Sequence, residues 1–179
     1  MKNILGFPPQ LFIGRSGEKP EPQKMEPIQN QLYWNKPNGG LWTSTYQRET
    51  DDSDWLEWCK VEQPDWIPET RWLLYPKDGL RILRIDSLSD LKKALVDFRA
   101  TRGPAFLSTR FFAILDFEKL SQEFDGMHLT RKGQAETRMT EPSLYGWDCE
   151  STLWFRWCFD RVEAIGKALA SKRMIFLED

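Results

Sequence analysis

Histidine and paired cysteines are scarce in this chain of 179 residues, and their scarcity narrows the chemistry open to it. His128 is the only histidine, and the three cysteines, Cys59, Cys149 and Cys158, form no Cys-x-x-Cys pair. Zinc sites need three or four His, Cys or carboxylate ligands. We therefore expect no metal centre, reduced thiols, and no mechanism that depends on two histidines.

Phosphate-binding and nucleophile motifs are also missing. Gly39-Gly40 is followed by Leu and Trp, and no Gly-Lys-Ser/Thr triplet occurs, which disfavours nucleotide kinases and Rossmann enzymes. Ser16, Ser44 and Ser151 lack the Gly-x-Ser-x-Gly elbow of serine hydrolases. A hydrolase triad is poorly supported as well, because the single histidine follows no nucleophile pattern.

The chain has neither a long apolar run nor a strong charge of one sign. Its net charge is −2 and its pI is 5.6, with Lys and Arg scattered, so nucleic acid is not favoured as a partner. No stretch approaches the ~20 apolar residues of a membrane span, and residues 1–9 do not resemble a signal peptide. We expect a soluble, cytoplasmic protein; nothing in the sequence indicates its oligomeric state.

The length and the pattern of the chain predict one α+β domain over residues 1–179. A chain of this size buries its own core without disulfides. Short strands outnumber helices, and the helices fall in the first two thirds, which argues against alternating βαβ units. Residues 15–31 are rich in Pro and polar residues and are expected to form a loop.

Three helices are predicted from side chains that cap them. Ser53, Ser87 and Asp116 each precede a segment with apolar residues at helical spacing, at 54–61, 88–98 and 116–124. The polar residues 131–143 are expected to form a loop. Strands are expected at 11–14, 40–46, 71–75, 80–86, 105–115, 127–130 and 173–177.

Two of these interpretations involve a choice. Residues 71–75 and 80–86 are predicted to pair as a hairpin that turns at 76–79. Residues 162–170 favour a strand, with a helix as the alternative. Nine tryptophans are far above ordinary usage, and we expect most of them in the core and some along a pocket that stacks flat rings.

Asp148 and Glu150 carry the strongest chemical signal. They stand two residues apart where a β-prone, Trp-rich segment begins. Side chains at this spacing share one face of a strand, so the two carboxyls are expected side by side. Like charges at close range disfavour joint ionisation, which indicates either a catalytic pair or a surface feature at a strand entrance.

Three blocks of sequence resemble the core signature of ADP-ribosyltransferases, the enzymes that cleave NAD and transfer ADP-ribose. Residues 11–16 resemble the strand that ends in a His or Arg and contacts the cofactor. Residues 40–45 resemble the aromatic or Ser-Thr-Ser strand under the nicotinamide ribose. Residues 148–155 resemble the acidic-x-Glu strand, and residues 124–130 before them resemble the segment that precedes it in small bacterial and phage members.

This resemblance implies two packed antiparallel or mixed sheets with short flanking helices, NAD as substrate, and a protein acceptor. It implies that Glu150 binds the ribose 2′-hydroxyl. The cofactor-binding residues that it implies are Gly14, Arg15, Trp42, Thr43 and Ser44. Ile13 stands where the family often has His, and Asp148 replaces its usual Glu or Gln.

The residues fit that chemistry in part. A carboxylate that offsets the positive charge of an oxocarbenium-like state assists cleavage at a sugar carbon, and Glu150 is our candidate, with Asp148 as the residue that orients or deprotonates the acceptor. Ser44 and Trp42 are expected to face one pocket, with Thr43 and Thr45 facing the other way. The alternative hypothesis is a non-catalytic, Trp-rich inhibitor that binds a protein partner, of bacterial or phage origin.

Overall fold

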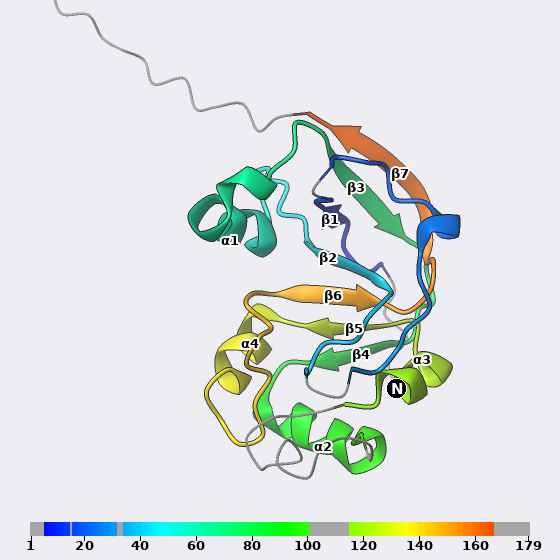
Figure 1. Cartoon of the computed structure of the whole chain (residues 1–179), viewed down its shortest axis with the longest axis vertical. Coiled ribbons are helices and arrows are strands. Elements are labelled where there is room, and N and C mark those ends of the chain that lie inside the picture. The colour runs from blue at the N-terminus through cyan, green and yellow to red at the C-terminus, as the bar shows by residue number, and fades with distance from the viewer. Residues whose placement is uncertain (1–5, 15, 32–33, 101–114, 167–179) are drawn as a thin grey trace, which may run out of the picture.

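The computed structural model describes residues 6–14, 16–31, 34–100 and 115–166, and its strands form one mixed sheet of seven strands (Figure 1). The order across the sheet is β4-β5-β6-β2-β1-β3-β7, and the β4–β5 pair is parallel while the others are antiparallel. The strands are β1 (Gln10–Phe12), β2 (Leu41–Thr45), β3 (Arg71–Pro76), β4 (Ile82–Ile85), β5 (Gly126–Leu129), β6 (Ser151–Trp154) and β7 (Phe159–Ile165).

The three helices predicted from their caps are confirmed. The helices are α1 (Asp54–Glu62), α2 (Leu88–Phe98), α3 (Phe117–Glu123) and α4 (Arg131–Thr137), with 3-10 turns η1 (Pro22–Lys24) and η2 (Pro64–Trp66). The side chains of Ser53, Ser87 and Asp116 accept hydrogen bonds from backbone N–H groups three residues on, as good N-caps do.

The predicted loop at 131–143 is wrong over its first half, because α4 lies there. Thr130 caps this helix by accepting a hydrogen bond from the Gly133 N–H at 3.0 Å. A glycine in a polar, seven-residue segment hides the apolar spacing that marks a helix. Here the helix forms because Gly133 lets it approach β4 closely.

The α+β class is confirmed, but the described strands belong to one sheet and not to two packed ones. Figure 1 shows that the β3 and β7 end of the sheet runs at a large angle to the β4, β5 and β6 end. The predicted hairpin between 71–75 and 80–86 is wrong: β3 pairs with β1 and β7, and β4 pairs with β5. Alternating apolar residues identify a strand but not its partner.

Two further strand predictions fall largely outside the described residues. Residues 105–114 and 173–177 belong to the undescribed segments, as do 167–170. Within the described part, residues 162–165 continue β7, so the strand interpretation holds there and the helical alternative does not.

The sheet has a core on each face. On one face, α2 and α3 cover Ile85, Met127, Leu129 and Leu153. On the other face, Trp154 packs within a second cluster of buried apolar residues. Leu153 and Trp154 point to opposite faces, as neighbours in a strand must, and both are completely buried. β6 is therefore an inner strand, with a neighbouring strand on each side and a packed core on each face.

The prediction that most tryptophans lie in the core holds in part, because Trp147 and Trp154 belong to it and Trp42, Trp72 and Trp157 pack against it. Only Trp147 and Trp154 of the nine are buried, Trp34 is exposed, and the other six are half-buried. Half-buried indoles are available to line pockets, since one face packs on the protein while the other stays open.

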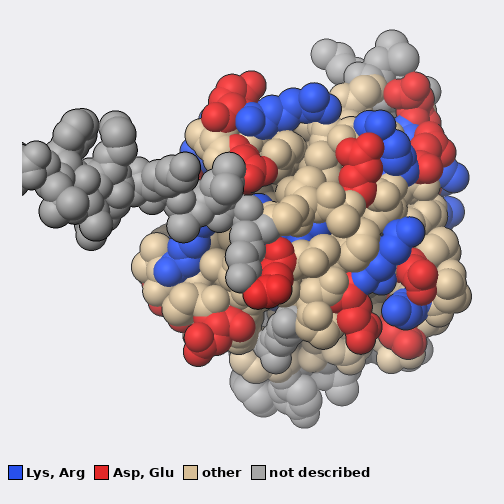
Figure 2. All heavy atoms as spheres, turned by 90° about the horizontal axis from the view of Figure 1, so that it is seen from above, with Lys and Arg blue, Asp and Glu red and all other residues tan. Residues whose placement is uncertain are grey.

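The surface charges are mixed. Figure 2 shows acidic and basic side chains interspersed over the face seen from above, without one sign dominating it. None of the described helices has both the length and the apolar character needed to cross a membrane.

The close approach of α4 to β4 can be tested at Gly133. A Cβ added there would lie 2.0 Å from the Ile85 carbonyl oxygen, far inside contact distance. Helix propensity alone would make Gly133→Ala stabilising by about 1 kcal/mol. We expect the clash to reverse that sign and to destabilise the protein by about 2 kcal/mol, measured by urea unfolding.

The matched control is Lys132→Ala, the preceding residue of the same helix, whose exposed side chain forms an i,i+4 ion pair with Glu136. Lys132→Ala should change the free energy of unfolding by no more than about 0.5 kcal/mol. A Gly133→Ala variant as stable as the parent would show that α4 does not press on β4.

Candidate functional site

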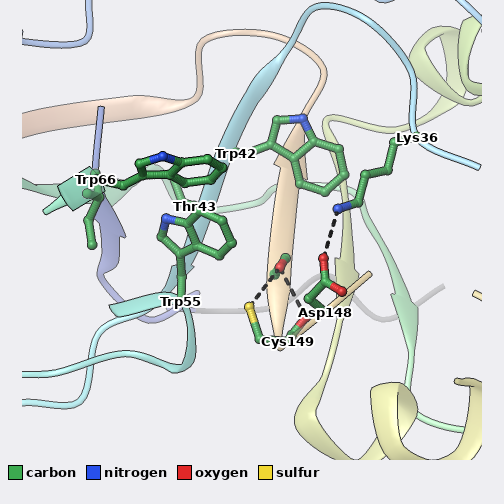
Figure 3. A pocket seen from close by; sticks show the side chains of 9 residues that line it. Lys36, Trp42, Thr43, Trp55, Trp66, Asp148 and Cys149 are labelled. Atoms are coloured by element: carbon green, nitrogen blue, oxygen red, sulfur yellow. Dashed lines mark hydrogen bonds and ion pairs between the residues drawn. The ribbon is translucent and has the colours of Figure 1, made fainter. Parts of the chain in front are cut away.

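A cavity of about 310 Å³ lies where α1 and η2 face strands β1, β2 and β6 (Figure 3). Ligand pockets usually measure about 300–1,000 Å³, so this one has room for a single ring system and not for a whole dinucleotide. It is lined by Ile13, Lys36, Trp42, Thr43, Trp55, Trp66, Asp148, Cys149 and Ser151.

Three indoles form the walls of this cavity. Figure 3 shows Trp55 and Trp66 on one side and Trp42 on the other. Trp55 is stacked on Trp58 with ring centroids 4.8 Å apart, and Trp66 lies 6.3 Å from Trp55. Trp42 packs edge-on against the buried Trp147 at 4.7 Å. Each wall is thus held by a second aromatic ring, which suits a flat ligand.

The charged groups of the cavity form loose pairs. Asp148 lies 3.6 Å from the Lys36 Nζ and 3.8 Å from the Arg138 Nη1. The Lys36 ammonium also stands 5.5 Å from the centre of the Trp42 ring. Two cations thus share one carboxylate, so this side of the cavity favours an anionic group on a ligand over a cationic one.

Glu150 lies behind the cavity in a tight hydrogen-bonded cluster. Its carboxylate accepts a hydrogen bond from the Ser44 hydroxyl at 2.6 Å, from the Thr45 hydroxyl at 2.8 Å and from the Thr45 backbone N–H at 2.9 Å. The residue is only 7% exposed. Its chain neighbours Cys149 and Ser151 point into the cavity, whereas Glu150 is not among the lining residues.

The end of a strand pair explains this position. The β2–β6 ladder ends with Thr43 opposite Thr152, so the next residues of the two strands, toward Thr45 and Glu150, are no longer paired with one another. The Glu150 carboxylate reaches across and satisfies the Thr45 N–H. A buried backbone donor has to find a partner, and here a side chain supplies it.

Ser44 connects this cluster to the cavity wall. Its hydroxyl donates to Glu150 and accepts a hydrogen bond at 3.3 Å from the N–H of Trp55, in the first turn of α1. The position of Trp55 is therefore coupled to the carboxylate through one hydroxyl group.

Burial favours the neutral forms of both Glu150 and the nearby His128. Loss of solvent raises the pKa of Glu150, although the hydrogen bonds from Ser44 and Thr45 oppose that rise. Loss of solvent lowers the pKa of His128 to about 4, and the nearby Arg84 acts in the same direction. The His128 Nδ1 lies 2.8 Å from the Thr152 hydroxyl and 3.4 Å from a Glu150 oxygen. At neutral pH this contact joins a neutral ring to the carboxyl and is not an ion pair.

The cysteine in the cavity is a poor nucleophile. Burial, with a smaller contribution from nearby carboxylates, raises the pKa of the Cys149 thiol to about 12. The reactive form of cysteine is the thiolate, so this thiol is inert at neutral pH. All three cysteines are free, as expected.

The structure brings some of the predicted site residues together and separates others. Trp42, Thr43 and Asp148 line the cavity, and Glu150 is bonded to Ser44. Gly14 lines a different, smaller pocket near η1. Arg15 lies outside the described residues.

Two predictions about these side chains are wrong. Asp148 lines the cavity and Glu150 does not, because both precede β6, outside any strand, where the two-residue repeat does not apply. Ser44 is completely buried and does not line the cavity with Trp42, whereas Thr43 does. Ser44 lies within β2 and is still paired with Leu11 of β1, and its hydroxyl turns to Glu150 and away from the cavity.

Sequence reasoning missed the cavity residues contributed by other segments. Trp55, Trp66 and Lys36 line the cavity but were not identified as site residues, nor was Arg138, which lies beside Asp148. Only the unusual number of tryptophans pointed to them, because the return of η2 toward α1 is a tertiary feature.

No protein-family model, curated protein or solved structure matches this chain. The site is therefore interpreted from its own geometry.

The buried histidine generates a prediction for stability against pH. Between pH 6.5 and about 4 the unfolded chain binds a proton at His128 and the folded chain does not. Stability should therefore fall as the pH falls through this range, by about 3 kcal/mol in total. Urea unfolding at a series of pH values measures the loss, and comparison with His128→Asn isolates it, because the chain has no other histidine.

The opposite sign would contradict the neutral ring. If His128 and Glu150 formed an ion pair, the folded pKa of His128 would be raised, and the parent would gain stability over His128→Asn as the pH falls.

Proposed function

We propose that this protein binds NAD and cleaves the bond between nicotinamide and ribose, transferring ADP-ribose to a protein acceptor. The observation that carries the proposal is the hydrogen-bonded contact of Glu150 with Ser44 and Thr45, at 2.6–2.9 Å. These residues belong to two of the three blocks that resemble ADP-ribosyltransferases.

The arrangement of the strands supports the proposal. The three blocks are more than 20 residues apart in the sequence, yet they contribute β1, β2 and β6, which are neighbours in the order β6-β2-β1. An enzyme of this kind needs its acidic residue and its hydroxyl-bearing strand next to each other, and the sheet provides that.

The chemistry assigns a part to each group. Cleavage leaves positive charge on the ribose carbon, and the Glu150 carboxylate offsets that charge while it accepts a hydrogen bond from the sugar. The nicotinamide ring stacks between the indoles of Trp42 and Trp55. Asp148, at the cavity surface, orients the acceptor. The rest of the dinucleotide extends outside the cavity, which holds one ring system.

Glu150 reaches the sugar only by exchanging a partner. Both of its oxygens already accept hydrogen bonds from protein groups. The ribose 2′-hydroxyl is the same kind of donor as the Thr45 hydroxyl and takes its place, because the half-buried Thr45 can bond water instead whereas the completely buried Ser44 cannot. The backbone N–H of Thr45 keeps the carboxylate in place meanwhile.

Glu150→Gln tests the proposal. The amide keeps the size of the side chain but removes its charge, so we expect the release of nicotinamide from NAD to fall by about 10²–10³-fold. NAD affinity, measured by calorimetry, should change far less. Release of nicotinamide is followed by chromatography, with and without candidate acceptor proteins.

Glu136→Gln is the matched control, because this carboxyl is exposed on α4 and pairs only with Lys132. It should leave both measurements unchanged. Wild-type protein that neither binds NAD nor releases nicotinamide would end the proposal, as would equal activity in Glu150→Gln.

A specific observation favours a second candidate, a non-catalytic protein that binds its partner through aromatic surface. Glu150 is 7% exposed with both oxygens occupied, as expected of a structural clamp. Trp34 and Tyr145 are 68% and 48% exposed, and such residues often anchor protein interfaces. This candidate predicts no nicotinamide release, and an activity-independent loss of stability in Glu150→Gln.

A further inference from the structure

Arg71 is a buried charge whose hydrogen-bonding capacity is only partly used. Its side chain is 1% exposed at the start of β3. The Nη2 donates to the Gly166 carbonyl at 2.8 Å, but the Nη1 has no hydrogen-bond partner among the described residues. A buried guanidinium with an unused donor is costly, and an ordered water, an ion or a ligand can supply the missing acceptor.

The start of β3, which carries Arg71, lies next to the end of β1 that leads into the tryptophan cavity. The β1–β3 register pairs Phe12 with Trp72, so continuing it by one residue places Ile13 opposite Arg71. Ile13 is part of the cavity lining. Because Ile13 follows Phe12 and Arg71 precedes Trp72, the backbone of Arg71 lies next to the strand that contributes this part of the cavity wall.

Asp51 occupies the place of an anion next to Arg71. Its carboxylate lies 3.6 Å from the Arg71 Nη2, which is too far for a hydrogen bond. Asp51 is 49% exposed by its side chain and is the one described residue other than glycine with a positive φ, at 52°. The Tyr46 hydroxyl donates to it at 2.7 Å and holds it over the guanidinium. The pair is thus loose, strained in its backbone, and open to solvent on one side.

We propose that Arg71 is the anion-binding group of this site, and that a phosphoryl group of the ligand takes the place of the Asp51 carboxylate. The identity of that ligand as a dinucleotide rests on the proposed function. A phosphate group presents several acceptor oxygens, so it satisfies both terminal nitrogens of a guanidinium, which Asp51 does not. Asp51 belongs to the turn at residues 47–52, which the Gln47–Asp52 bridge closes. In this proposal the turn moves the Asp51 carboxylate away from Arg71 when the phosphoryl group binds.

Calorimetric titration with ADP and with inorganic pyrophosphate tests this assignment. Arg71→Gln should weaken both by about 10- to 100-fold, because hydrogen bonds to a charged group are lost. Asp51→Asn should instead strengthen both by about three- to fivefold, because the competing carboxylate loses its charge. If Arg71 served only to stabilise the fold, Asp51→Asn would not be expected to strengthen the binding of ADP and pyrophosphate.

Controls keep the result interpretable. Arg84→Gln removes a half-exposed guanidinium at the other end of the sheet and should change nothing. If Arg71→Gln does not fold, as judged by thermal unfolding, Arg71→Lys and Asp51→Asn decide the question. Affinities unchanged in Asp51→Asn, or no binding of pyrophosphate and ADP by the parent, overturn the proposal.

Binding of ADP and release of nicotinamide test the anion site and the enzyme activity separately. Binding of ADP that depends on Arg71, without any release of nicotinamide from NAD, keeps the anion site and removes the enzyme. Release of nicotinamide that is unchanged in Arg71→Gln keeps the enzyme and removes the anion site.

Discussion

The hydrogen bonds from Ser44 and Thr45 to the buried Glu150 carboxylate hold together the part of the sheet that carries the candidate site. A carboxyl group removed from water is costly unless donors surround it, and three donors do so here. The dependence is mutual, because without Glu150 the Thr45 N–H and two hydroxyls would be buried without acceptors. β2 and β6 therefore stay adjacent beyond the end of their backbone ladder.

This cluster continues into a polar network across the centre of the sheet. The Thr43 hydroxyl donates to the Gln10 side chain and accepts from the Trp154 indole N–H, both at 2.8 Å. Gln10 in turn donates to Thr45. Strands β1, β2 and β6 are thus fixed by side chains as well as by backbone bonds. A fully satisfied buried network specifies one arrangement, since each misplaced member would leave another unpaired.

The same cluster positions the cavity. Ser44 accepts a hydrogen bond from the Trp55 N–H, and the neighbouring Asp54 carboxylate pairs with the Arg131 guanidinium at the start of α4. The first turn of α1 is therefore fixed from the sheet on one side and from α4 on the other. The indole of Trp55 inherits that position, and stacking on Trp58 fixes its plane.

Local features of the fold followed from the sequence, and the pairing of distant segments did not. Ser53, Ser87 and Asp116 predicted three helices because an N-cap acts within one turn. The partners of β3 and β4 depend on which apolar faces meet, and a four-residue strand contains little information about that. In the site, both Ser44 and Glu150 were identified from the sequence, but their contact depends on how β2 and β6 pair, and the Trp66 wall depends on how η2 folds back.

The distances between charged groups separate the groups that hold the fold from those free to meet a ligand. Glu150 is bonded at 2.6–2.9 Å, whereas Asp148 lies 3.6–3.8 Å from Lys36 and Arg138, and Asp51 lies 3.6 Å from Arg71. Ion pairs at the longer distance, with one half-exposed member, contribute little stability and exchange readily with a ligand's charges. Because loose pairs of this kind lie beside the indole walls, a ligand that combines a flat ring with an anionic group matches the site better than one with a ring alone.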